Sequence, residues 1–141
     1  MASVKKDLHN QLALVRGVNP VATGSTAQTG ATFDRAAAGD DAPSVAIVFY
    51  FGTYTDGTWT PGVEHSDDDS SWSATTDYSG SLTAVDSATN EDNVIQAVSY
   101  TGSKRYVRGV LAETANGTTG ILFSCLYVGA GGSVNQALEA G

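Results

Sequence analysis

The sequence is short of basic residues, cysteine and proline. Its 141 residues include seven Lys and Arg, three Pro and one Cys. The lone cysteine, Cys125, excludes a disulfide within the chain. Fifteen Asp and Glu give a formal net charge of −8, and the few basic residues are too scattered to follow a phosphate backbone, so nucleic acid is a poor candidate partner. The acidic excess favours solubility instead.

Long hydrophobic runs are also missing. No stretch approaches the roughly 20 apolar residues that a membrane span requires. The N-terminal residues become polar after Lys5 and Lys6 and lack the apolar core of a secretory signal. The sequence therefore predicts synthesis in the cytoplasm and no membrane partner. Cys125 lies in the apolar run Ile121–Val128, which predicts a buried, inert thiol.

The sequence does contain short apolar runs separated by turn signals, with 16 Gly and many Ser and Thr. This pattern indicates strands, not helices. Asp56-Gly57 and Asn116-Gly117 are typical of hairpin turns. The predicted strands are Gln11–Val15, Thr29–Arg35, Ser44–Thr53, Trp59–His65, Trp72–Thr76, Val94–Tyr100, Arg105–Glu113 and Gly120–Gly129, with a loop or extended arm over Arg16–Gly30 and an edge position or bulge at Pro61.

The length suits a single domain over residues 1–141. The strand count and the absence of alternating strands and helices predict an all-β fold, an antiparallel β-sandwich that is jelly-roll-like. An extended N-terminal arm (1–8) and a C-terminal tail (129–141) complete the predicted domain.

Three predicted strands are apolar on both faces. Even and odd positions are apolar in Val45–Phe51, in Ile121–Val128 and in Tyr106–Leu111. A sandwich strand normally shows one face to the core and one to water, and a small monomer seldom exposes a large contiguous apolar surface. The pattern favours a second subunit covering the outer faces. The alternatives are cover by the chain's own loops and arms, or burial of these strands at the centre of the sandwich.

The stretch VEHSDDDSSW (Val63–Trp72) is the densest group of candidate ligands. Asp67, Asp69 and Ser71 have the spacing that opens an EF-hand loop, but Trp72 replaces the required glycine and Tyr78 the bidentate glutamate. A shallow cation site and paired-carboxylate chemistry remain alternatives. No nucleophile motif accompanies the histidines, and Asp and Ser favour turns. We predict a hairpin tip, with Trp72 restarting the strand as an anchor in the sandwich, and no metal, cofactor or catalytic residue.

Two longer motifs carry a resemblance to a known family. They are the hairpin SYTGSKRYVRGVL (Ser99–Leu111) with the following ETANGTTG (Glu113–Gly120), and the upstream YTDGTWTPGVEHSDDDSSWSA (Tyr54–Ala74). In order and spacing they resemble small virion proteins of the head module of tailed bacteriophages, over roughly Leu8–Val128. The sequence departs from that pattern by an insertion at Asp77–Asn93 and by its C-terminal end.

The resemblance implies a non-enzymatic capsid decoration or cement protein, located in the virion on the outer capsid surface. It implies the major capsid protein and sister subunits, as a dimer or trimer, as partners. The basic cluster Lys104, Arg105 and Arg108 is either a solvated face or a docking patch. Alternatives are a neck, connector or tail component, or a carbohydrate-binding sandwich with Trp59 and Trp72 as stacking platforms. The predicted interaction residues are Lys104, Arg105, Arg108, Val45, Ile47, Phe49, Phe51, Ile121 and Phe123.

Overall fold

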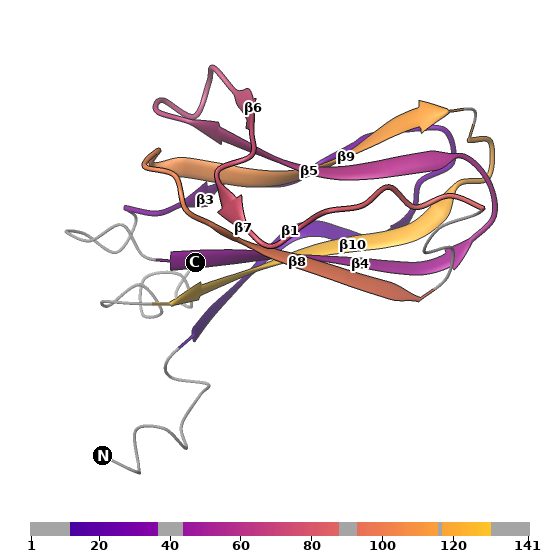
Figure 1. The fold of residues 1–141 in the computed structure, drawn as a ribbon, viewed down its shortest axis with the longest axis horizontal. Helices are drawn as coiled ribbons and strands as arrows, with labels where there is room; N and C mark the ends of the chain where they lie inside the picture. Colours follow the sequence, from indigo (N-terminus) through magenta and orange to yellow (C-terminus); the bar gives the residue numbers. More distant parts are fainter. Residues whose placement is uncertain (1–11, 37–43, 88–92, 116, 131–141) are drawn as a thin grey trace, which may run out of the picture.

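The computed structural model describes residues 12–36, 44–87, 93–115 and 117–130, and every regular element within them is a β-strand (Figure 1). The strands are β1 (Leu12–Ala22), β2 (Gln28–Thr29), β3 (Phe33–Asp34), β4 (Ser44–Tyr54), β5 (Thr58–Ser66), β6 (Ser73–Thr75), β7 (Tyr78–Ser79), β8 (Val94–Tyr100), β9 (Tyr106–Ala115) and β10 (Ile121–Ala130). No helix in this part of the chain has the length and apolar character needed to span a membrane.

The strands form two antiparallel sheets packed as two layers (Figure 1). Sheet A has the order β1-β10-β4-β8-β7, and sheet B the order β2-β9-β5-β6, with β3 also paired to β9. When the short β2 and β3 are counted as one strand, and β7 with β8 as another, the chain moves to the opposite sheet at every connection except that from β5 to β6. This is the strand order of a jelly roll. The predicted fold class is confirmed. Gly129 and Ala130 of the predicted tail belong to β10; the rest of the tail and the arm lie outside the described residues.

The two predicted hairpin turns are arches between the sheets. Gly57 has the expected positive φ of 91°, but β4 and β5 on either side of it lie in different sheets. Residue 116 is not described, and Gly117 likewise connects β9 of sheet B to β10 of sheet A. The Asp56 carboxylate joins the two arches by accepting the backbone N–H groups of Thr118 and Gly120 at 2.8 and 2.7 Å. These bonds hold the pKa of Asp56 below its ordinary value.

β1 is longer than predicted. It continues through the stretch expected to be loop, as far as Ala22, because β10 offers it a partner along its whole length. Register shifts between Arg16 and Val18 and between Val18 and Val21 accommodate Gly17 and Pro20 as local irregularities of an edge strand. Pro61 pairs with Leu111 of β9 on one side. On its other side β6 pairs with β5 only from Val63 onward, so the predicted edge position is confirmed there.

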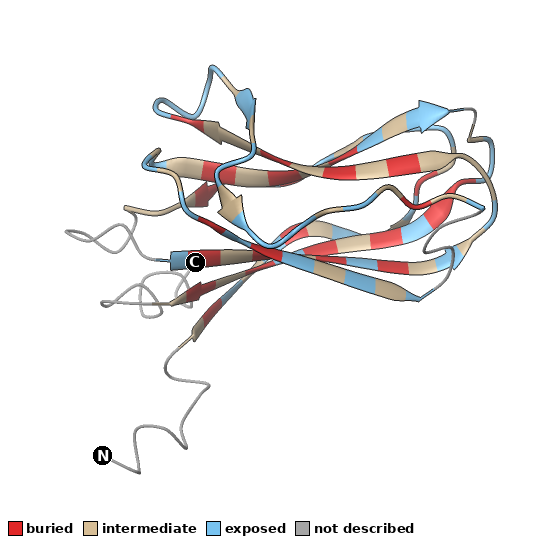
Figure 2. Cartoon of the chain, in the orientation of Figure 1, coloured by how far each residue is buried: buried red, intermediate tan, exposed pale blue. Residues whose placement is uncertain are grey.

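The core lies between the two sheets, and its residues mark the inward face of each strand. Alternate residues of β4 and β10 are buried, and their neighbours point outward (Figure 2). The buried set includes all six apolar residues predicted to contact a partner: Val45, Ile47, Phe49, Phe51, Ile121 and Phe123. That prediction is wrong for these six, because they pack against the other sheet within the same subunit. Cys125 is buried beside them, as predicted, and burial raises the pKa of its thiol to about 12.

Tyr127 links the two layers with a buried hydroxyl group. It accepts the Gly109 N–H of β9 at 3.0 Å and donates to the Ala31 carbonyl at 2.6 Å. Its ring meets Phe33 edge to face, with ring centroids 6.1 Å apart. A Cβ at Gly30 would collide with this hydroxyl group and one at Gly17 would lie 2.8 Å from the ring, so both glycines make room for the tyrosine.

We expect Tyr127→Phe to lower the free energy of unfolding by about 1–3 kcal/mol, because it leaves the buried Gly109 N–H without its acceptor. Urea denaturation followed by circular dichroism measures the change. Tyr106→Phe is the matched control: its side chain is half-buried on the outer face of β9 in sheet B, and its expected effect is within about 0.5 kcal/mol. Equal effects of the two substitutions would contradict this account of Tyr127.

Candidate functional site

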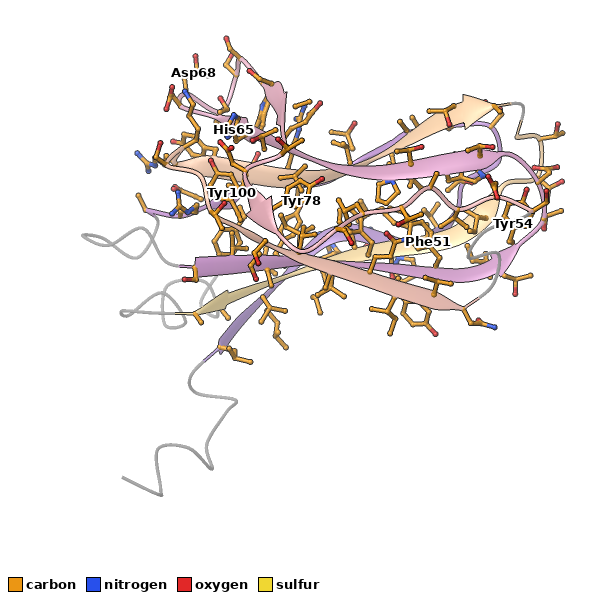
Figure 3. The ribbon with its side chains drawn as sticks, viewed as in Figure 1. Phe51, Tyr54, His65, Asp68, Tyr78 and Tyr100 are labelled. Carbon is orange, nitrogen blue, oxygen red and sulfur yellow. The ribbon has the colours of Figure 1, made fainter. Side chains whose placement is uncertain are left out.

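The acidic stretch forms a self-contained turn between β5 and β6. The Asp68 carboxylate accepts the N–H groups of Ser70 and Ser71 at 2.9 and 2.8 Å and the Ser66 hydroxyl at 2.9 Å (Figure 3). These hydrogen bonds, the Ser71 N–H first, lower the pKa of Asp68 to about 2. Asp69 takes a left-handed conformation with φ of 58°. The predicted hairpin tip is confirmed.

The other two aspartates of the turn have separate partners. Asp67 binds Lys104 Nζ at 2.5 Å, and Asp69 accepts a hydrogen bond from the Thr32 hydroxyl at 2.7 Å. Within the described residues, no group of three or more His, Cys, Asp or Glu side chains is arranged to hold a metal ion. These carboxylates bind the chain's own residues and hold the turn against Thr32 and Lys104.

A histidine–tyrosine pair that sequence reasoning missed lies under this turn. His65 Nδ1 and the Tyr100 hydroxyl are 2.8 Å apart, and the same hydroxyl accepts the Lys104 N–H at 3.1 Å (Figure 3). The Tyr100 hydroxyl has one proton and two lone pairs, so it can donate to His65 or accept from it, according to the imidazole tautomer. The pair connects β5 of one sheet to the end of β8 in the other. Ser66 bonds Asp68 and not His65, so these residues form no nucleophile–base pair.

The basic cluster is neutralised within the subunit. Arg105 makes two hydrogen bonds to Asp34, at 2.8 and 2.9 Å, and Arg108 binds Glu64 at 2.7 Å. With Lys104 held by Asp67, each of the three basic side chains faces an acid of its own chain. The hydrogen bond to Asp67 raises the pKa of Lys104. The structure favours the solvated-face interpretation of this cluster over the docking patch.

The two tryptophans do not form a stacking platform. Trp59 is fully buried, and its indole N–H donates to the Asp56 carbonyl at 2.8 Å. Trp72 lies outside the core, where the Arg108 guanidinium stands 4.1 Å from its ring centroid. The prediction that Trp59 and Trp72 together present sugar-stacking rings is wrong, and so is the prediction that Trp72 anchors the sandwich.

The outer face of sheet A carries all the exposed large apolar side chains of the described residues. Side chains project from it on the side away from sheet B (Figure 3). Five large apolar side chains from four adjacent strands are exposed there: Leu14 (59%), Tyr50 (49%), Ile95 (65%), Leu122 (48%) and Leu126 (38%). The pairing register places Tyr50 between Ser124 and Ile95, and Leu126 between Arg16 and Val48. The apolar outer faces predicted from the sequence are therefore present on sheet A, at the positions alternate to the predicted ones.

A groove indents this face where β1, β10 and β4 meet. It has a volume of about 420 Å³ and is lined by Pro20, Val21, Ala22, Tyr50, Gly52 and Leu122, among others. Gly52 has no side chain to fill the groove, and a Cβ added at this position would lie only 3.1 Å from the Leu122 Cβ. Apolar grooves of this kind accept apolar side chains of a partner.

Charge is nearly absent from the same face. Among the outward-pointing residues of β1, β10, β4 and β8, Arg16 alone is charged and none is acidic. The full chain has 15 acidic residues and a net charge of −8. The acidic excess is thus kept off the surface that is richest in exposed apolar side chains, a combination typical of contact surfaces between proteins.

Comparisons with known proteins do not assign the chain to a family. No protein-family model matches the chain, and no curated protein sequence matches it. Among solved structures, the chain is similar to the N-terminal CBM22-1–GH10 modules of endo-1,4-β-D-xylanase 10B from Clostridium thermocellum, complexed with xylohexaose. The identity is 12% and the TM-score 0.45, over 88% of this chain and 27% of the xylanase chain. The chain therefore spans about a quarter of the length of that protein.

Proposed function

We propose that this chain is a structural, non-enzymatic protein of a tailed-phage head, bound as decoration on the outer surface of the capsid. The observation that carries the proposal is the apolar, acid-free outer face of sheet A, because such a face acts by contact with protein. The resemblance of Tyr54–Ala74 and Ser99–Leu111 to small phage head proteins supports the same conclusion. A jelly roll is also a fold that such proteins commonly have.

The geometry suits a cement. A rigid two-layer sandwich presents one apolar face, and each large side chain buried on contact contributes about 1.5–3 kcal/mol. Leu12 pairs with Ala130, so these two residues lie side by side at one end of sheet A (Figure 1). In the proposed arrangement the N-terminal arm and the C-terminal tail reach the major capsid protein, while the sandwich contacts sister subunits. Repeated across capsomer boundaries, such contacts raise the free energy needed to rupture a shell under internal DNA pressure.

Copy number tests the proposal. In purified particles of a phage that encodes the chain, a quantitative protein gel should show hundreds of copies per particle, and cryo-microscopy should place them on the head. About a dozen copies or fewer would instead support the neck or tail alternative, in which a symmetric ring sets the number. Absence from the particle, together with fluorescence quenching of the tryptophans by added glycans, would favour the carbohydrate-binding alternative.

A further inference from the structure

We propose that the first partner of the outer face of sheet A is a second copy of this chain, in a two-fold symmetric dimer. The inference deepens the proposed function by naming what covers the apolar face of the sandwich. It rests on the shape, area and charge of that face, each of which favours a copy of the chain.

The area of the face matches a dimer interface. β1, β10 and β4 have 11, 10 and 11 residues, and β8 has 7. At about 3.3 Å per residue and about 4.8 Å between strands, they cover about 620 Å². Stable, specific interfaces bury upward of about 600 Å² on each partner. The outer face of sheet A is thus large enough to hold two copies together, provided that most of it is used.

Charge favours a copy over a separate basic partner. Two copies that each carry −8 repel one another unless their acidic residues stay away from the interface. The outward residues of β1, β10, β4 and β8 meet this condition, since none is acidic. The one charge, Arg16, is exposed on the edge strand β1, where its guanidinium can reach water at the rim. A basic partner would find no acid on this face to bind.

The face is also complementary to itself. A two-fold axis that runs along the strands, between β10 and β4, places β10 of each copy over β4 of the other and β8 over β1. Rows that pair β10 with β4 then bring large side chains against small ones. Leu126 meets Val48, Tyr50 meets Ser124 and Val128 meets Ala46.

The same axis fills the groove. Ile95 pairs with Tyr50 in the row that also contains Ser124, and Ser124 lines the groove with Pro20 and Leu122. Placing β8 over β1 therefore lowers Ile95, the most exposed large apolar side chain described, into the groove of the other copy. Two such insertions occur in each dimer, one on either side of the axis.

Sedimentation equilibrium of the purified full chain tests the dimer. We expect a mass of twice 14.5 kDa at micromolar concentrations. Ile95→Glu and Leu126→Glu should each raise the dissociation constant by about 30-fold or more, the effect of losing one interface hot spot. Ser124→Trp, which sets a large side chain against the partner's Tyr50, should weaken the dimer without adding charge.

Ala112→Glu is the matched control, because Ala112 is exposed on the outer face of β9 in sheet B; it should leave the dimer intact. Circular dichroism checks the fold of each variant. Because Ile95 is the more exposed of the two side chains, Ile95→Glu is expected to fold even if Leu126→Glu does not. A monomeric wild-type chain, a trimer, or a dimer unaffected by Ile95→Glu and Leu126→Glu would overturn the proposal. A monomer that still covers the capsid would overturn the dimer alone, whereas a dimer absent from virions would overturn only the proposed function.

Discussion

Trp59→Ala is expected to lower the free energy of unfolding by about 3–5 kcal/mol, the cost typical of deleting a buried aromatic side chain and leaving a cavity. Trp59 is fully buried between the sheets. Its backbone also exchanges both hydrogen bonds with Val85, at 2.9 and 2.8 Å, which fixes the polar segment before β8 against β5. Domains of this size have a total stability of about 5–15 kcal/mol, so the variant should be close to unfolding at 37 °C.

Trp72→Ala is the control for this substitution. Its half-buried ring contacts the Arg108 guanidinium, and losing a cation–π contact at such a site costs about 0.5–1 kcal/mol. Urea denaturation followed by circular dichroism compares the two variants without relying on tryptophan fluorescence. A Trp72→Ala effect as large as that of Trp59→Ala would contradict the placement of Trp59 as the core residue and Trp72 as a surface residue.

Gly120→Ala is expected to destabilise the fold by about 2–4 kcal/mol, since it combines a left-handed backbone with a steric clash. Gly120 has φ of 83°. A Cβ there would collide with the Thr23 hydroxyl and lie 2.5 Å from the Gly24 carbonyl oxygen. The same residue donates to Asp56 and accepts the Thr55 N–H at 2.9 Å. Displacing it disturbs both arches at this end of the sandwich.

Gly62→Ala separates this clash from the general effect of replacing glycine. Gly62 lies in β5, and a Cβ there would make ordinary contact with Val110 at 3.5 Å. Alanine at such a site restricts the unfolded chain and should be neutral or stabilising by up to about 1 kcal/mol. Thermal unfolding by calorimetry measures both variants. If Gly120→Ala melted at the temperature of the wild-type protein, the described geometry of the arch would be wrong.

The sequence was sufficient to predict the sandwich and the position of most long strands. Continuous apolar runs marked β4 and β10, and β8 was predicted with its observed limits. The acidic turn was predicted because Asp and Ser bond their own backbone. Each of these features is local, so the residues within the segment determine it.

Features that depend on distant residues were not predictable from local patterns. Asp56-Gly57 specifies a positive φ, but whether the following strand pairs with β4 or crosses to the other sheet depends on which strands flank it. The length of β1 depends on its pairing with β10, more than one hundred residues later. The charge pairing of Arg105 with Asp34 likewise joins residues far apart in the chain.

The inward phase of β4 was misread because both of its faces are apolar. A usable signal was side-chain size: the inward positions are Val45, Ile47, Phe49 and Phe51, whereas the outward ones include Ala46 and Gly52. The outer face of β4 also carries Val48 and Tyr50, so side-chain size distinguishes the two faces only at Ala46 and Gly52. Size alone does not reveal which large side chains of sheet A are exposed.

The position of β10 has a consequence for folding during synthesis. β10 follows the other described strands in sequence and lies between β1 and β4 in sheet A, so the ribosome synthesises both of its neighbours before the strand that joins them. Until then β1 has no neighbour in its sheet, and both it and β4 present unpaired backbone groups that can join other chains. Truncated products that end before Ile121 should therefore aggregate.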